Sequence, residues 1–323
     1  MPGDLTSSPS SPSSNLPPKP RAGSGLRGQV RRDELLGWGA GQLRDLPWRR
    51  TRDPWAVLVS EVMAQQTGVD RVVPCYEAFL ARFPTPASCA AAPVSTVLRM
   101  WSGMGYNRRA VNLHRCAAAL VGDHGGTVPD DLAALLALPG IGPYTARAVL
   151  AFAFERPVGV IDTNVGRVLA RWAGAPLRPA DAQATADALV PPEPDRAWLW
   201  NQAVMELGAT VCRRRTPDCT RCPITDGCAW ARAGRPAPDP ADGSAGVGKG
   251  QSRFEGSDRQ GRGRLVDALR LGPVGAGDLP AVMGWPDDPG RATRVAKGVV
   301  ADGLAERDGD TFHLPGSLTL RMP

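Results

Sequence analysis

Two acidic residues of the chain stand at positions where a carboxyl group could do chemistry. Glu61 lies among apolar residues at helical spacing, so partial burial should raise its pKa and keep it available as a proton donor. Asp162 follows an extended apolar segment and begins an amphipathic helix, where it should stay ionised. An acid and a carboxylate form the pair that cleaves glycosidic bonds. The simpler alternatives are a solvated carboxylate at position 61 and an ordinary helix N-cap at position 162.

A glycine-rich turn lies shortly before Asp162, where residues 138–143 read Leu-Pro-Gly-Ile-Gly-Pro. Apolar residues at helical spacing flank this turn, which predicts two short helices joined by a hairpin. Gly140 and Gly142 allow the tight turn, and Pro143 suits the first position of the second helix. Backbone N–H groups exposed at that helix N-terminus would bind phosphate. A plain connection between two helices is the alternative.

Four cysteines form a cluster in the sequence with the spacing C-x6-C-x2-C-x5-C, namely Cys212, Cys219, Cys222 and Cys228. In a chain without secretory features, such a cluster favours a metal site over disulfides. Four thiolates can hold either zinc or an iron–sulfur cluster. Zinc sites usually contain two C-x2-C pairs, and this segment contains one, but the residues alone leave both groups open.

The basic residues are almost all arginines. The formal net charge of +6 is a mild excess that favours an acidic partner such as nucleic acid. Lysine occurs only at Lys19, Lys249 and Lys297. Schiff-base chemistry, which requires a lysine amine, is therefore not expected from the long stretch between Lys19 and Lys249.

Composition divides the chain into four parts. Residues 1–27, rich in Ser, Pro and Gly, predict a disordered tail. Residues 28–232 have apolar residues at helical spacing and short loops, which predicts an all-α domain that includes the cysteine loop, 212–228. Residues 233–255 predict a flexible linker. Residues 256–323 predict a small accessory domain of three helices and a two-stranded ribbon that turns at Asp-Gly, similar to a winged helix.

From Leu46 to Trp230 the chain resembles the adenine DNA glycosylases of the MutY type, within the superfamily that includes endonuclease III. The resemblance is carried, in chain order, by Leu46-Pro-Trp48-Arg49, 60–67, Trp101–Tyr106, the hairpin at 138–142, Ile161–Asn164, 201–208 and the four cysteines. It implies a helix-hairpin-helix DNA glycosylase fold with two helical subdomains and a [4Fe–4S] loop. The small winged-helix-like domain would be an addition at the C-terminus.

The resemblance also implies roles for individual residues. Asn164 and Tyr144 would orient the two catalytic acids, and Tyr144 stands where lyase-type relatives present a lysine. The remaining positions are Trp48, Arg49, Gln202 and Glu206 in the adenine pocket; Gln66, Met104 and Tyr106 at the DNA stack, with Tyr106 beside the opposing base; Gly140 and Gly142 at the phosphate backbone; and the four cysteines on the cluster.

The implied activity is that of a monofunctional adenine DNA glycosylase of base excision repair. It would hydrolyse the N-glycosidic bond of adenine mispaired with 8-oxoguanine or guanine in double-stranded DNA. The alternatives are a glycosylase and abasic-site lyase for oxidised pyrimidines, and a non-catalytic iron–sulfur DNA-binding regulator. Many family members carry a longer C-terminal domain that reads 8-oxoguanine, so the preference between the two mispairs stays open here.

The sequence does not predict a membrane partner. No run approaches 18 consecutive apolar residues, which excludes an expected transmembrane helix. The N-terminus lacks the basic and then apolar pattern of a secretory signal. We therefore expect a monomer in the cytoplasm, associated with the nucleoid.

Overall fold

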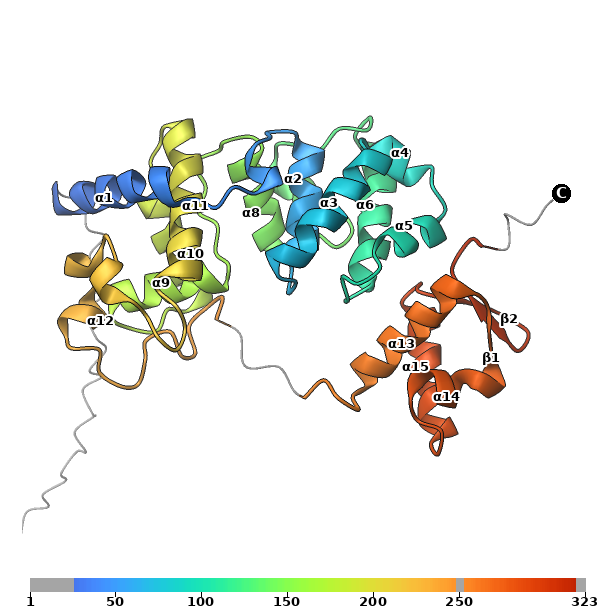
Figure 1. Cartoon of the computed structure of the whole chain (residues 1–323). Helices are drawn as coiled ribbons and strands as arrows, with labels where there is room; N and C mark the ends of the chain where they lie inside the picture. Colours follow the sequence, from blue (N-terminus) through green and yellow to red (C-terminus); the bar gives the residue numbers. More distant parts are fainter. Residues whose placement is uncertain (1–25, 248–252, 318–323) are drawn as a thin grey trace, which may run out of the picture.

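The computed structural model describes residues 26–247 and 253–317. Nearly all of the predicted tail and residues 248–252 of the predicted linker lie outside these residues. In the described part the chain is mostly helical, and its three short strands belong to the C-terminal region (Figure 1). The predicted fold class is thereby confirmed. No helix of the described residues is long and apolar enough to cross a membrane.

Two hydrophobic cores organise the helices that precede the C-terminal region. One core gathers apolar residues of the helices from α2 to α8, and the other gathers those of α1, α9, α10 and α11. Helix α1 packs across α11, so it completes the second group (Figure 1). The bounds are α1 (Leu26–Gln42), α2 (Pro54–Ala64), α3 (Val69–Arg82), α4 (Pro86–Ala90), α5 (Val94–Met100), α6 (Arg108–Asp123), α7 (Leu132–Ala137), α8 (Pro143–Phe152), α9 (Thr163–Ala173), α10 (Pro179–Leu189), α11 (Pro194–Thr210) and α12 (Ala229–Arg232).

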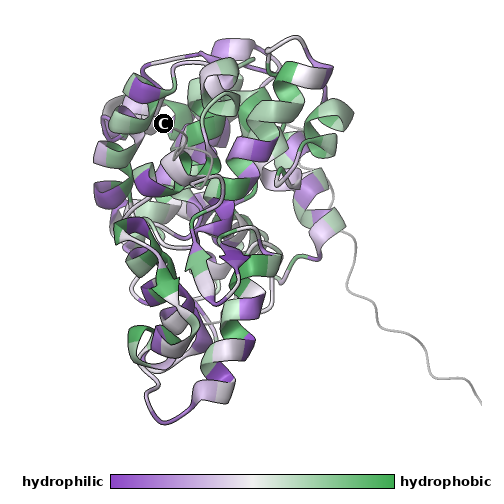
Figure 2. Ribbon diagram, turned by 90° about the vertical axis from the view of Figure 1, so that its right-hand side faces the viewer, coloured by the Kyte–Doolittle hydropathy of each residue, from purple (hydrophilic) through white to green (hydrophobic). Residues whose placement is uncertain are grey.

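The helices combine polar and apolar residues along their length, as expected of helices that bury one face (Figure 2). Local sequence signals mark the starts of the helices that carry candidate site residues. Pro54 begins α2 and Pro143 begins α8, where the fixed φ of proline suits the first turn. Asp162 caps α9. Gly140 has a φ of +79°, a conformation that other residues rarely adopt, and it joins α7 and α8 into the predicted hairpin.

The C-terminal region contains three helices and a small antiparallel sheet with the strand order β1-β3-β2. The hairpin β2–β3 turns at Gly309, close to the predicted Asp-Gly turn. Strand β1 adds a third strand that was not predicted, because two residues are too few for an alternating pattern. The bounds are α13 (Asp258–Leu271), β1 (Val274–Gly275), α14 (Leu279–Met283), α15 (Pro289–Ala301), β2 (Glu306–Asp308) and β3 (Thr311–His313).

This C-terminal domain is packed against the helices of the first core. Its buried apolar residues are continuous with the core of α2–α8, and α13 lies against α5. A backbone hydrogen bond also connects the two parts, because Ser95 N–H donates to the carbonyl of Pro315 at 3.1 Å. The domain is therefore part of one body with the helices that carry Glu61.

The first half of the predicted linker differs from the prediction. Residues 236–247 pack against α9, and Ala241 and Ser244 are buried. Ser244 Oγ accepts the N–H of Leu177 at 3.0 Å, and the carbonyl of Leu177 accepts the N–H of Ala245. The composition suggested flexibility because Pro and Gly are frequent in linkers, but here these residues follow the irregular path of a packed segment.

Candidate active site

Glu61 lies on α2 with only 7% of its surface exposed, so its carboxyl is inside the protein. Tyr144, at the start of α8, donates its hydroxyl to Glu61 Oε2 at 2.8 Å. Burial raises the pKa of Glu61 to about 7, the bond from Tyr144 opposes this shift, and the charge of Asp162 adds to it. The expected raised pKa of Glu61 is therefore confirmed, and its cause is desolvation.

Asp162 lies at the N-terminus of α9 and accepts three N–H groups. Its Oδ1 accepts the backbone N–H of Asn164 at 2.9 Å and of Val165 at 2.7 Å, and its Oδ2 accepts Asn164 Nδ2 at 2.9 Å. Burial raises the pKa of Asp162 above its ordinary value, while these donors oppose the shift. The expectation that Asp162 stays ionised is supported by these donors, and burial acts against it.

The two acids come from the two different cores and meet in one electrostatic environment. The charge of Asp162 raises the pKa of Glu61, and both acids raise the pKa of Tyr144 further above its ordinary value, after the larger effect of burial. Such coupling requires that the groups lie close together with little water between them. The structure therefore brings together the acids and Tyr144, as the sequence predicted.

A second polar group beside Glu61 links the segment before α2 to α11. Arg49 Nε donates to Gln202 Oε1 at 2.8 Å, and Arg49 Nη2 donates to Glu206 Oε2 at 2.8 Å. The Glu206 side chain is fully buried and also receives Arg44 Nε at 2.6 Å. Arg49 lowers the pKa of Glu61 through its charge, so this group borders the same site.

Trp48 was predicted to line the adenine pocket, and Met104 was predicted to lie at the DNA stack. Trp48 is half-buried and packs edge-on against Tyr76, with 5.4 Å between ring centroids. Met104 is 1% exposed and belongs to the core. Its side chain does not reach the surface, so the predicted DNA contact of Met104 is corrected to a packing role.

Gln66 and Tyr106 lie on two loops that follow α2 and α5. Both have left-handed backbones, with φ of 57° and 45°, and 42% of the Tyr106 surface is exposed. Residues other than glycine adopt this conformation at a cost of about 1 kcal/mol or more, and such strain is concentrated at functional sites. The structure thus projects both predicted wedge residues from strained turns.

Arg109, which sequence reasoning missed, joins these two loops. Its Nη1 donates to the carbonyls of Met63 and Gln65, and its Nη2 donates to the carbonyls of Met104 and Gly105. Burial lowers the pKa of Arg109 to about 10. An arginine that begins a helix gives no sequence signal for this role, because most such side chains are solvated.

The four cysteines line a single cavity of about 30 Å³, together with Arg171 and Trp230. Each thiol influences another electrostatically, since Cys212, Cys219 and Cys228 raise the pKa of Cys222 in addition to burial. Four sulfurs around one cavity are a donor set that suits a cluster. Among residues 26–247 and 253–317, no three His, Cys, Asp or Glu side chains are grouped tightly enough to hold a single metal ion.

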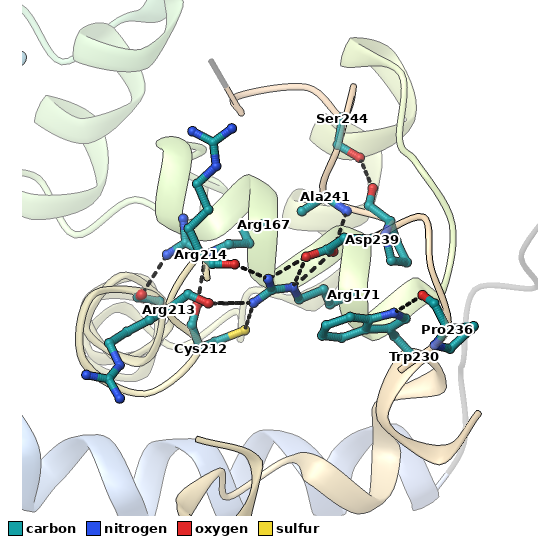
Figure 3. Close-up of polar contacts among 12 residues, drawn as sticks. Arg167, Arg171, Cys212, Arg213, Arg214, Trp230, Pro236, Asp239, Ala241 and Ser244 are labelled. Carbon is teal, nitrogen blue, oxygen red and sulfur yellow. Dashed lines mark hydrogen bonds and ion pairs between the residues drawn. The ribbon is translucent and has the colours of Figure 1, made fainter. Parts of the chain in front are cut away.

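Arg171 connects the cysteine loop to α9 (Figure 3). Its Nη1 lies 3.3 Å from Cys212 Sγ and donates to the carbonyl of Arg213 at 2.9 Å, while its Nη2 donates to the carbonyl of Arg214 at 2.8 Å. The guanidinium also lies over the Trp230 ring, 4.6 Å from the ring centroid. One side chain therefore fixes the first part of the cysteine loop.

Asp239, from the packed segment 236–247, holds this arginine in place (Figure 3). Both of its carboxylate oxygens accept Arg171 Nε at 3.1 Å, and Oδ2 accepts Nη2 at 2.5 Å. Burial alone would raise the pKa of Asp239, but the bonds from Arg171 lower it below its ordinary value. The segment expected to be a flexible linker thus supports the cysteine loop.

Comparisons with known proteins agree with this geometry. Residues 59–192 match the family described as the HhH-GPD superfamily base excision DNA repair protein. The chain is 46% identical over 292 residues to an adenine DNA glycosylase of Mycobacterium tuberculosis, covering 87% of this chain and 92% of that protein. It is 44% identical over 291 residues to an adenine DNA glycosylase of Mycolicibacterium smegmatis, covering 88% of this chain and 95% of that protein.

A solved structure of a thermostable thymine-DNA glycosylase has a similar fold, with a TM-score of 0.60 and 28% identity over 64% of this chain and 97% of that chain. The fold and the matches define the class, DNA N-glycosylases of base excision repair built on the helix-hairpin-helix scaffold. Within that class, the chain belongs to the adenine DNA glycosylase family.

Asp239→Ala should weaken the cysteine loop, because it leaves the buried guanidinium of Arg171 without its charged partner. We expect a loss of about 2 kcal/mol in unfolding free energy and faster proteolytic cleavage within residues 212–228. Thermal unfolding and limited proteolysis measure these effects. The control is Asp242→Ala, an exposed acid three residues along; equal effects of the two variants would contradict the assigned role of Asp239.

Proposed function

We propose that the chain hydrolyses the N-glycosidic bond of adenine mispaired with 8-oxoguanine or guanine in double-stranded DNA, and leaves the strand intact. One observation carries this proposal, the buried Glu61 carboxyl with a pKa near 7, bonded to Tyr144 and coupled to Asp162. Glu61 then supplies an acid and Asp162 an anion within one site. The names of the two mycobacterial relatives support adenine as the base that is removed.

Glu61 is the proton donor in this mechanism. A carboxyl with a pKa near the working pH is protonated often enough to give its proton to adenine N7. Protonation makes adenine a better leaving group, so the C1′–N9 bond breaks and its electron pair leaves with the base. The bond from Tyr144 fixes one oxygen of the carboxyl and orients the other.

Asp162 stabilises the positive charge that develops on the sugar. Two N–H donors occupy its Oδ1 and one occupies its Oδ2. A carboxylate has about four acceptor positions, so one on Oδ2 remains for C1′ or for the attacking water. Water then adds to C1′ and gives up a proton to the Glu61 carboxylate, which restores the proton that Glu61 gave to the base. Asn164 positions the carboxylate through its side-chain amide.

The remaining residues bind and extrude the nucleotide. The target base must leave the stack before the acids can reach it. Arg49, with Gln202 and Glu206, provides a polar wall beside Glu61 for the extruded base. Gln66 and Tyr106 project from their strained turns to fill the space left in the stack. Gly140 and Gly142, at the start of α8, offer backbone N–H groups to phosphate.

Hydrolysis is favoured over strand cleavage because the position of a lyase lysine is occupied by Tyr144. Tyr144 is committed to Glu61, and burial raises its pKa well above the ordinary value, so it stays a neutral hydrogen-bond donor. No lysine occurs between Lys19 and Lys249. No lysine amine in this stretch is therefore available to form an imine with the sugar.

We also propose that Cys212, Cys219, Cys222 and Cys228 hold a [4Fe–4S] cluster. The support is their common cavity and the spacing that resembles the family loop. When bound, the cluster would supply four iron–thiolate bonds that tie the loop together. The loop then presents Arg213, Arg214 and Arg215, all exposed, to the DNA backbone.

The assignment of the cluster is tested by its composition. Purified protein should contain about four iron and four sulfide per chain, with visible absorption. Stoichiometric zinc without iron would contradict the assignment. Cys75→Ser, which changes a thiol outside the loop, should leave the iron content unchanged, whereas Cys222→Ser should reduce it.

Asp162→Asn should lower adenine release from an A·8-oxoguanine duplex by about a hundredfold to a thousandfold, because the anion that faces the sugar is lost. Binding to the duplex should remain. A labelled strand followed with and without alkali measures both release and strand cleavage. The control is Asp131→Asn, which changes the N-cap of α7 in the same way. Cleavage without alkali, or full turnover of Asp162→Asn, would contradict the mechanism.

The single-turnover rate should fall as the pH rises above about 7, because Glu61 must be protonated to act and its pKa is about 7. The Tyr144 bond lowers that pKa, so Tyr144→Phe should move the descending limb to higher pH. Tyr76→Phe, which removes a hydroxyl beside Trp48, is the control and should leave the limb in place. A shift to lower pH in Tyr144→Phe would contradict the assignment.

A further inference from the structure

The C-terminal domain reaches the Tyr106 loop through one buried arginine. Arg270, on α13, has a side chain that is 8% exposed. Its Nε donates to the carbonyl of Leu98 at 2.9 Å, and its Nη2 donates to Asn107 Oδ1 at 2.8 Å. Leu98 lies at the end of α5, and Asn107 precedes α6. One guanidinium therefore joins both ends of the loop that carries Tyr106.

The remaining donor group of Arg270 faces an exposed acid on its own helix. Its Nη1 is bonded to Asp267, one turn earlier on α13. Burial lowers the pKa of Arg270, which reflects how much water the guanidinium has lost. A buried guanidinium that has lost water depends on its fixed acceptors. The acceptors in the neighbouring domain therefore hold the guanidinium, while the exposed Asp267 contributes little.

Other contacts place the C-terminal domain against the same segment. Arg108, next to Asn107, forms an ion pair with Asp302 at 3.5 Å. Gly303, with a φ of +71°, passes close to the guanidinium of Arg115 on α6. The domain therefore contacts α5 and α6 on either side of the Tyr106 loop, and Arg270 is the contact that bonds both ends of it.

The Tyr106 loop combines residues of left-handed backbone with hydrogen bonds of its own, such as the bond from Trp101 Nε1 to the carbonyl of Gly105 at 3.1 Å. Gly103 and Gly105 both have positive φ, and Tyr106 itself has a φ of 45°. Arg109 binds the carbonyls of this loop from the protein interior, and Arg270 binds its ends from the C-terminal domain. A strained turn persists only when its surroundings impose it. Two buried arginines contribute to that constraint here.

We propose that Arg270 is a positioning residue for DNA recognition, and that the C-terminal domain acts through it. By holding Asn107, it keeps Tyr106 in the strained conformation from which the ring enters the duplex opposite the extruded base. This inference rests on the proposed function. It gives the winged-helix-like domain a part in reading the mispair, through the shape of a loop in the neighbouring domain.

The test uses the full-length chain and four variants. Arg270→Gln removes the charged donor, Asn107→Ala removes its acceptor, and the double variant removes both. Asp267→Asn is the matched control, because it alters a partner of the same guanidinium without touching the loop. Thermal unfolding of each variant separates loss of fold from loss of position.

Arg270→Gln and Asn107→Ala should each lower the single-turnover rate on A·8-oxoguanine and A·guanine duplexes by about tenfold, as expected for the loss of one charged hydrogen bond. The double variant should be no slower than either single variant, because both changes break the same link. The binding preference for a mispaired over a fully paired duplex should fall in parallel. Asp267→Asn should behave as the wild type.

The inference is overturned if the rates and the binding preference of the two single variants match the wild type, or if the two effects add in the double variant. Amide exchange at Gly105–Asn107, which should quicken in both single variants, needs no turnover. It therefore tests the inference even if the wild-type chain releases no adenine, a result that would instead overturn the proposed function.

Discussion

The structure depends on keeping one carboxyl group out of water. Glu61 is placed on a helix that is almost entirely buried, and its pKa is adjusted further by the hydrogen bond from Tyr144 and the charges of Asp162 and Arg49. Desolvation moves its pKa toward neutrality, and this shift requires that the helices of both cores close over the site. The packing of α1 on α11, the position of α9 and the hairpin before α8 all serve that closure. A looser assembly would rehydrate Glu61 and return it to an ordinary carboxylate.

Much of this arrangement could be predicted from the sequence. The hairpin and the start of α8 follow from Gly140 and Pro143, whose backbone preferences leave few alternatives. The N-cap at Asp162 follows from the change between an extended apolar segment and an amphipathic helix. The turn at Gly309 follows in the same way from its Asp-Gly pair. In each case the signal is local, since a few consecutive residues restrict the backbone strongly.

The parts that could not be predicted depend on contacts between distant residues. Arg109, Arg171 and Arg270 look like surface residues in the sequence, because nothing in their neighbours announces a set of buried carbonyl acceptors. The segment around Asp239 has the composition of a linker, but an ion pair with Arg171 on α9 holds it in place. The burial of Met104 also depends on loops that meet only in the folded chain.

The buried arginines differ in one respect from the arginines that would face DNA. Arg109 and Arg270 are bound mainly by neutral acceptors, the backbone carbonyls and the side-chain amide of Asn107. Dissolved ions screen attraction between exposed charges but have little effect on short contacts with buried neutral oxygens. Binding to phosphate therefore weakens as ionic strength rises, while the internal loop geometry persists. The protein can be released from its polyanionic partner by salt and still keep the shape with which it would bind again.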